Sequence, residues 1–269
     1  MILLDPNARP IIAHRGASAD APENTLEAFA LAGEQGADAF ELDVHVTRDD
    51  IPVVIHDTTL RRTAGRPDAV REQSLAAIQQ ADAGSTFVAQ DGSRPWKGRG
   101  VRVPTLADVL RRFPEVPMLL EIKTPDTQGP AARVLEREGA AGRCVVASFL
   151  SRALEAFRRP PFLVGASRRD ILGLVARSRL GFPSSPPGCL LFAVPDYWRG
   201  IEVPRPGLVA EARRHGRPVH VWTVDDPARA AVLRTRGVSG IITNAPGKMR
   251  EGLGSSGMNP APAGPSRGT

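Results

Sequence analysis

The sequence predicts an α/β protein of the (β/α)8 TIM-barrel class. Three observations support this prediction. Short apolar runs rich in β-branched residues recur along the chain, amphipathic helix patterns separate most of them, and 269 residues suit one barrel domain. One run follows its predecessor too closely to be a parallel strand, which leaves eight runs for the barrel itself.

The candidate strands are PIIAHRG (10–16), AFELDVHVT (39–47), PVVIHD (52–57), PMLLEIK (117–123), CVVASF (144–149), FLVGAS (162–167), CLLFAVP (189–195), PVHVWTV (218–224) and VSGIITNAP (238–246). The first helix pattern places Leu26, Phe29, Ala30 and Gly33 at positions i, i+3, i+4 and i+7. Asn24 precedes this pattern and is its expected N-cap, although a contact with substrate is an equal alternative.

The run 52–57 follows the run 39–47 after only a few residues, whereas a parallel crossover needs about a dozen. It therefore returns as an antiparallel hairpin arm. If Asp49-Asp50 forms a two-residue turn, Asp43 pairs with His56. His45 lies out along this hairpin, and we expect it on the surface.

We expect a single domain over residues 1–250. Residues 58–103, which follow the second strand and its hairpin arm, are rich in Gly, Arg, Asp and Gln and form an insertion over the barrel mouth. Residues 251–269 have few large apolar side chains, so we expect a disordered C-terminal tail.

The composition, 42% hydrophobic and 24% charged, is that of a globular protein, and no apolar run approaches the roughly 20 residues of a membrane span. We therefore expect no stable membrane insertion. The arginines are dispersed rather than clustered, which argues against nucleic acid as a partner. Cys144 and Cys189 lie in apolar runs, which favours buried thiols and a cytoplasmic protein. The sequence does not indicate the oligomeric state.

Four charged residues alternate with apolar ones on two expected barrel strands: Glu41, Asp43, Glu121 and Lys123. Helices cover the outer face of a barrel strand, so these side chains should point inward near the top. Clustered carboxylates need a neutralising partner, and a hard divalent cation with oxygen ligands is one. Such an ion suits a phosphodiester substrate.

Two histidines end apolar runs that reach the same mouth, His14 on the first strand and His56 on the hairpin arm. Together they can supply the acid and the base of a hydrolysis, and Arg15 and Lys123 can neutralise phosphate. Trp222 alternates inward with His220. The indole either fills the core or walls the substrate site, and His220 is the expected core histidine.

The chain resembles the glycerophosphodiester phosphodiesterase family through a series of motifs in order over about residues 10 to 248: HRG, ELD, HD, LEIK, HVWTVDD and GIITNAP. The resemblance implies a phospholipase-C-like barrel with catalytic His14 and His56. It implies one Mg²⁺ or Ca²⁺ on Glu41, Asp43 and Glu121. It further implies phosphate contacts from Arg15 and Lys123, a substrate wall at Trp222, and hydrolysis of a small glycerophosphodiester to glycerol 3-phosphate and an alcohol.

This chain departs from the family pattern at two places. Asp49-Asp50 replaces a usual Asp-Gly in the hairpin, and Asn244 replaces a usual Asp at the mouth of the last strand, where it removes a charge. Two alternatives stay open. One is a lysophospholipase D-like or sphingomyelinase-like phospholipase, which needs an apolar patch or basic face that residues 58–103 do not clearly offer. The other is a metal- and phosphate-binding sensor without catalysis.

Overall fold

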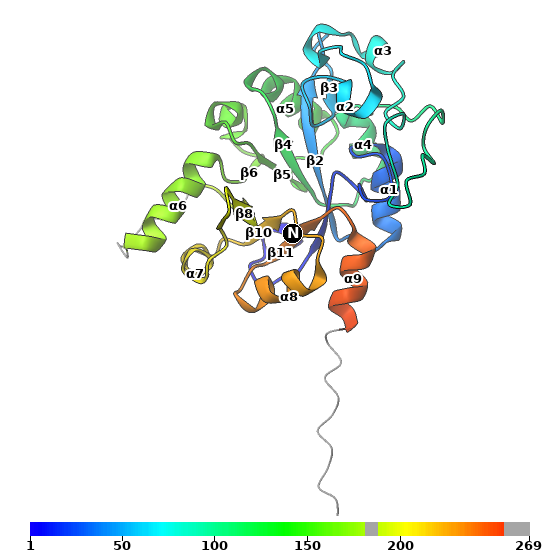
Figure 1. The fold of residues 1–269 in the computed structure, drawn as a ribbon. Coiled ribbons are helices and arrows are strands. Elements are labelled where there is room, and N and C mark those ends of the chain that lie inside the picture. The colour runs from blue at the N-terminus through cyan, green and yellow to red at the C-terminus, as the bar shows by residue number, and fades with distance from the viewer. Residues whose placement is uncertain (181–187, 256–269) are drawn as a thin grey trace, which may run out of the picture.

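The computed structural model describes residues 1–180 and 188–255, and in this part of the chain eight parallel strands form one curled sheet (Figure 1). Its order is β6-β5-β4-β2-β1-β11-β10-β7. The strands are β1 (Ile11–His14), β2 (Ala39–Val46), β4 (Met118–Ile122), β5 (Cys144–Ala147), β6 (Leu163–Val164), β7 (Phe192–Pro195), β10 (Val219–Trp222) and β11 (Gly240–Thr243). Each lies within one of the expected runs.

The two end strands of this order, β6 and β7, are joined through the residues beside them. Leu190 N donates to Val164 O at 2.8 Å, and Ala166 N donates to Leu191 O at 2.9 Å. The sheet therefore closes on itself. The predicted barrel is confirmed.

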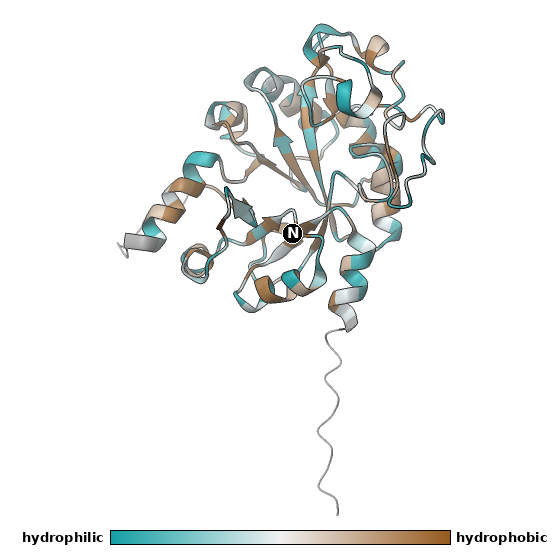
Figure 2. Cartoon of the chain, viewed as in Figure 1, coloured by the Kyte–Doolittle hydropathy of each residue, from teal (hydrophilic) through white to brown (hydrophobic). Residues whose placement is uncertain are grey.

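A helix follows each barrel strand in the described chain. These helices are α1 (Leu26–Glu34), α4 (Leu106–Arg112), α5 (Gln128–Arg137), the 3-10 helix η4 (Ser151–Phe157), α6 (Arg168–Leu180), α7 (Pro206–Arg214), α8 (Pro227–Thr235) and α9 (Pro246–Ser255). Figure 1 shows them around the outside of the strands. Hydrophobic and hydrophilic bands alternate along β2 and β4 in Figure 2, as expected for strands with one face on the helices and one inside the barrel. No helix among the described residues is long and apolar enough to span a membrane.

The lower interior of the barrel is apolar. Leu3, in the short 3-10 helix η1 (Ile2–Leu4), is fully buried against Ile12, Leu119 and Ile242. His220 lies in the same region, also fully buried, and its Nε2 donates to Leu3 O at 2.9 Å. The predicted core histidine is confirmed, and polar chemistry is left to the opposite, C-terminal end of the strands.

The hairpin arm β3 (Pro52–Val54) pairs antiparallel with β2, but in a register one residue away from the expected one. Thr47 N donates to Ile51 O at 3.0 Å, so the turn has three residues, and its third residue, Asp50, has a φ of 57°. A three-residue loop with its last residue in the left-handed region is a common hairpin connection. The two-residue turn was therefore wrong, and Ile55 rather than His56 stands opposite Asp43.

His45 is buried, with 5% of its surface exposed, and its Nε2 lies 3.1 Å from His56 O. The expected surface position was wrong. All of β2 is buried, and apolar residues of the 58–103 segment pack against the hairpin arm at Val53 and Ile55.

The 58–103 segment contains α2 (Arg61–Ala64), the 3-10 helix η2 (Val70–Glu72) and α3 (Leu75–Ile78), which lie beside β3 in Figure 1. Its apolar residues form a small core with Val53 and Ile55. Its position over the mouth stays a prediction. At the other end, α9 continues through Ser255, beyond the expected boundary at residue 250, and residues 256–269 of the predicted tail lie outside the described chain.

A second, two-stranded sheet follows β7. It consists of β8 (Tyr197–Trp198) and β9 (Ile201–Glu202), paired antiparallel. In the barrel this hairpin occupies the loop between β7 and α7, at the C-terminal end of the strands, where the functional groups of this fold class collect.

Candidate active site

Strand register brings four of the expected site residues to two successive levels of the barrel. His14 of β1 is the parallel partner of Glu41 on β2, and Asp43 of β2 is the partner of Glu121 on β4. Partnered residues on adjacent strands point to the same face of a sheet. All four side chains therefore converge above the apolar lower layer.

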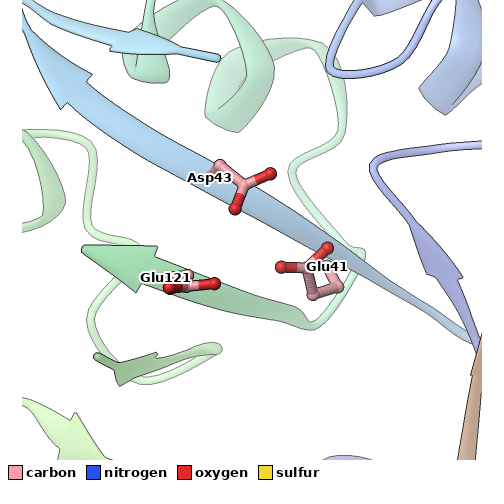
Figure 3. A group of neighbouring side chains, drawn as sticks. All are labelled: Glu41, Asp43 and Glu121. Atoms are coloured by element: carbon pink, nitrogen blue, oxygen red, sulfur yellow. The ribbon is translucent and has the colours of Figure 1, made fainter. Parts of the chain in front are cut away.

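The three carboxylates form a compact cluster, and Figure 3 shows Glu41, Asp43 and Glu121 pointing toward one another from β2 and β4. One oxygen from each lies within 4.8 Å of the others. Burial and the neighbouring Asp43 carboxylate raise the pKa of Glu41 well above its ordinary value, and burial raises the pKa of Glu121. Glu41 Oε2 is buried with no hydrogen-bond partner. An unsatisfied buried carboxylate beside two others is the donor set that a hard cation stabilises.

The pKa of Asp43 shifts in the opposite direction to those of Glu41 and Glu121. Burial favours its neutral form, but Lys123 and Arg15 hold the pKa of Asp43 below its ordinary value. Lys123 Nζ lies 3.3 Å from Asp43 Oδ1 and 3.1 Å from Glu121 Oε1, while Arg15 Nε lies 3.1 Å from Asp43 Oδ2. The two expected phosphate-binding cations therefore also balance the charge of the carboxylates.

Asn24 does not cap α1. The cap is Thr25, whose hydroxyl oxygen accepts from Ala28 N, while Asn24 adopts a φ of 58° and is buried. Asn24 Nδ2 donates to Asp43 Oδ2 at 2.9 Å. The predicted N-cap was wrong by one residue. Asn24 and Thr25 are both residue types that favour an N-cap, and here Thr25 caps α1 while the Asn24 side chain points to Asp43.

Arg15 reaches the cluster from a tight turn after β1, where its own φ is 59°. The next residue must be glycine, because Gly16 has a φ of 86° and a Cβ there would lie 2.6 Å from both the carbonyl carbon and the Cβ of Ala28. Burial would lower the pKa of Arg15, but Asp43, Glu23 and Glu41 raise it above its ordinary value. Arg15 is therefore a fixed cation beside the carboxylates.

His14 is held by two linked side chains, Asn244 directly after β11 and Asp225 in the loop after β10. Its Nδ1 lies 2.7 Å from Asn244 Oδ1, and Asn244 Nδ2 donates to Asp225 Oδ2 at 2.7 Å. Because a carboxylate only accepts, the Asn244 amide nitrogen must face Asp225, and its oxygen must accept from His14 Nδ1–H. His14 Nε2 is then free of a proton and lies 3.9 Å from Glu41 Oε2. Burial and Arg15 hold the pKa of His14 below its ordinary value.

His56 approaches from the hairpin arm, on the other side of the site. Its Nδ1 lies 2.6 Å from Asp57 Oδ1, and Arg62 Nε donates to Asp57 Oδ2 at 2.8 Å. The hydrogen bonds from Arg62 and His56 lower the pKa of Asp57 to about 2. The Asp57 carboxylate therefore accepts from His56 Nδ1–H and leaves Nε2 for a ligand.

The two sides are tied together by Glu23, which accepts from Arg15 Nη1 at 3.1 Å and from Arg62 Nη2 at 2.8 Å. Sequence reasoning missed Glu23, Asp57 and Arg62 as supporting residues. Asp57 follows His56 in the HD motif, but nothing in a single sequence indicates that Arg62 turns back to Glu23.

A cavity opens over this cluster. Its lining includes every expected site residue except Asp43, which lies behind Lys123 and Arg15. The lining residues are His14, Arg15, Glu41, His56, Leu119, Glu121, Lys123, Ala147, Ser148, Phe149, Ala166, Arg168, Ile171, Ala193, Trp222 and Ile242. Charged groups thus lie on the side of β1, β2 and β4, and mostly apolar ones lie opposite.

Trp222 stands in the apolar wall, and its ring meets that of Phe149 edge to face, with 6.0 Å between centroids. The sequence left two roles open for Trp222, filling the core or forming a wall of the site. The indole combines features of both, since it packs on Phe149 and also faces the cavity. Phe149 is a further wall residue that the sequence did not single out.

Comparison with known proteins identifies the relatives of this chain. Residues 14–156 and 188–248 match the sequence model of the glycerophosphoryl diester phosphodiesterase family. A glycerophosphodiester phosphodiesterase of Caldanaerobacter subterraneus is 31% identical over 245 residues, which cover 88% of this chain and 94% of the relative.

Solved structures agree with this match. The glycerophosphoryl diester phosphodiesterase domain of a Mycobacterium tuberculosis protein has a TM-score of 0.82 at 23% identity, covering 93% of this chain and all of that one. An Oleispira antarctica phosphodiesterase, solved in complex with the product sn-glycerol-3-phosphate, has a TM-score of 0.73 at 25% identity, covering 91% and 96%.

Proposed function

The chain belongs to the glycerophosphoryl diester phosphodiesterase family, and from this premise we propose that its cavity hydrolyses a glycerophosphodiester to glycerol 3-phosphate and an alcohol. The single observation that carries the proposal is the convergence of His14, His56, Glu41 and Glu121 on one cavity, with the Asp43 carboxylate clustered behind them. The relative solved with sn-glycerol-3-phosphate supports the same product.

Glu41, Asp43 and Glu121 hold one divalent cation, Mg²⁺ or Ca²⁺. The unpartnered Glu41 Oε2 and the raised pKa of Glu41 and Glu121 support this, because a cation beside them would satisfy the buried oxygens and favour their ionised forms. When bound, the ion polarises a phosphoryl oxygen and orients the diester.

Arg15 and Lys123 bind the phosphate. Each lies within 3.3 Å of an Asp43 oxygen, so the ion pairs with Asp43 hold the Arg15 guanidinium and the Lys123 ammonium group in place at the cavity. A phosphate that enters next to them meets donors whose orientation is already fixed, which lowers the entropy lost on binding.

His14 and His56 carry out the proton transfers. In each ring Nδ1 is occupied, by Asn244 or by Asp57, so Nε2 is the atom that exchanges a proton with the reactants. One Nε2 accepts the proton of the attacking oxygen, and the other donates a proton to the departing alkoxide. The two residues approach from β1 and from the hairpin arm, as attack and departure on opposite sides of phosphorus require.

Trp222 and Phe149 form the wall against which the carbon skeleton of the substrate packs. The sensor alternative is weaker, because a chain that had lost catalysis would have no need to retain both histidines with their hydrogen-bonded partners. We also propose a cytoplasmic location, supported by Cys144 and Cys189, which are buried and free.

The test is product identification. Purified protein with Mg²⁺ or Ca²⁺ should convert glycerophosphocholine to glycerol 3-phosphate and choline in equal amounts, and EDTA should stop the conversion. Formation of phosphocholine and glycerol would place the cut on the wrong phosphorus–oxygen bond and reject the proposal. Unchanged turnover in EDTA would reject the cation site.

A further inference from the structure

A further basic residue, Arg168, lines the cavity in addition to Arg15 and Lys123. It is the first residue of α6, and it is exposed. The sequence pattern did not single it out. Arg168 stands on the mostly apolar side of the cavity, so its charge lies apart from the carboxylate cluster on β2 and β4.

Arg168 differs from the other two cations in its partners. Arg15 lies 3.1 Å from a carboxylate oxygen of Glu23 and 3.1 Å from one of Asp43. Lys123 Nζ lies 3.3 Å from the other Asp43 oxygen. In the part of the chain that the structure describes, no carboxylate forms an ion pair with Arg168. Its charge is therefore available to a ligand in the cavity.

The guanidinium group of Arg168 is held at the rim of the cavity by the β8–β9 hairpin. Its Cζ lies 6.0 Å from the centroid of the Trp198 indole, and the face of an aromatic ring attracts a cation. Asp170, the nearest acid along α6, is turned to the start of that helix, where its Oδ2 accepts from Ser167 N at 2.8 Å and from Ser167 Oγ at 2.5 Å. The N–H groups of Arg168 can therefore bind an anion in their fork geometry.

Arg168 lies across the barrel mouth from the phosphate-binding groups. Between β6, which precedes Arg168, and β1 stand β5, β4 and β2 on one side and β7, β10 and β11 on the other. Figure 1 shows α6 and α1 on opposite sides of the barrel. A diester whose phosphate contacts Arg15, directly after β1, therefore extends one of its two substituents toward Arg168.

We propose that Arg168 selects glycerophosphodiesters whose alcohol carries an anionic group, a carboxylate or a phosphate. The proposal rests on the proposed function, because it places the central phosphate at Arg15 and Lys123. The alcohol, which departs into solvent, extends past the apolar wall to the exposed rim, where Arg168 donates to its anionic group. Choline and ethanolamine bring a cation to the same place, which Arg168 repels.

The reaction is the same hydrolysis for every alcohol. The oxygen of water forms a bond to phosphorus, and the bond from phosphorus to the alcohol oxygen breaks. One proton of water leaves to the base, and the acid protonates the alcohol oxygen. Arg168 takes no part in these proton transfers, so its contribution is to the choice of substrate.

The experiment compares glycerol 3-phosphate release within two matched pairs of substrates. Glycerophosphoserine differs from glycerophosphoethanolamine by one carboxylate, and glycerophosphoinositol 4-phosphate differs from glycerophosphoinositol by one phosphate. In each pair, the kcat/KM of the anionic member divided by that of its partner isolates the effect of the added group. Damage to the fold would lower both values together and leave this ratio unchanged.

The wild-type protein should show a ratio of at least about ten in one pair or both. Arg168→Gln should lower that ratio at least about five-fold, and Arg168→Glu should lower it further, because it replaces attraction by repulsion. Arg169→Gln is the matched control. It removes a positive charge from the next residue of α6, which is exposed and is not among the residues that line the cavity, so the ratio should not change.

The possible failures separate the two proposals. Ratios near one in both pairs, or a wild-type ratio that persists in Arg168→Glu, would overturn the role of Arg168 and leave the proposed function standing. Release of glycerol 3-phosphate from none of the substrates would overturn the proposed function as well. A preference confined to the serine pair would identify the selected group as a carboxylate, and one confined to the inositol pair would identify it as a phosphate.

Discussion

His14 Nδ1 and Asn244 Oδ1 lie 2.7 Å apart, and the amide of Asn244 is itself oriented by Asp225. A short neutral residue at the mouth of the last strand thus fixes which nitrogen of the histidine carries the proton. Asn244 also accepts from Ser18 Oγ at 2.8 Å, so its oxygen has two donors and little freedom to rotate. Asn244 lacks the negative charge of the usual Asp, but its hydrogen bonds fix an acceptor oxygen beside His14 Nδ1.

Asn244→Ala should reduce kcat about 10-fold to 100-fold with little change in KM, because His14 loses the acceptor that sets its tautomer. Steady-state kinetics on glycerophosphocholine measure both constants. Asp226→Ala is the matched control, since Asp226 only caps α8 and should cost about 1 kcal/mol of stability without changing kcat. An Asn244→Ala enzyme with unchanged kcat would show that His14 needs no such partner.

Glu121→Gln should weaken binding of Mg²⁺ or Ca²⁺ at least about ten-fold, because it removes one charged oxygen ligand from a cluster of three. The rise in melting temperature with cation concentration measures this without reference to activity. Glu115→Gln changes an exposed carboxylate just before the same strand and should leave the rise intact. An equal rise in the wild type and Glu121→Gln would place the cation elsewhere.

Gly16→Ala should destabilise the protein by about 3 kcal/mol or more, because the added methyl group would overlap the backbone of Ala28 as well as require a left-handed conformation. Gly139→Ala isolates the second effect, since Gly139 has a φ of 62° and nothing within 4 Å of an added Cβ. That control should lose only about 1 kcal/mol. Chemical denaturation measures both, and equal losses would mean that the contact with Ala28 is not limiting.

His220 should make the protein sensitive to acid between pH 6.5 and pH 4. Burial lowers the pKa of His220 to about 4, so the unfolded chain takes up a proton first as the pH falls. Stability is then full above pH 6.5 and is lost as the pH approaches 4, by about 3 kcal/mol. His220→Gln should remove this contribution, which the pH dependence of the unfolding free energy measures. A difference between wild type and variant that stays constant with pH would contradict the assignment.

The barrel was predictable from the sequence because its strands are local apolar runs and their order follows from parallel pairing. The inward carboxylates were predictable for the same reason, since alternation on a covered strand leaves only one direction for Glu41 and Asp43. The prediction of the hairpin register was wrong because a single residue determines the length of the turn. A left-handed Asp50 lengthens the hairpin turn by one residue and shifts its register.

The supporting contacts could not be predicted, because they join residues far apart in the chain. Asn244 reaches His14 across 230 positions, and Arg62 reaches Glu23 across 39. The burial of His45 could not be predicted either, because alternation places a residue on one face of a hairpin without indicating what packs there. Periodicity describes one element at a time, whereas these contacts depend on how the loops above the barrel fold together.

The most direct test of the site is glycerol 3-phosphate release from glycerophosphocholine by His14→Ala and His56→Ala, with His215→Ala, at the C-cap of the outer helix α7, as a control. Each of the first two variants should lose at least about 100-fold in kcat, since each removes one of the two proton-transfer groups. The His215→Ala enzyme should retain its turnover. Wild-type turnover in either His14→Ala or His56→Ala would contradict the paired acid and base.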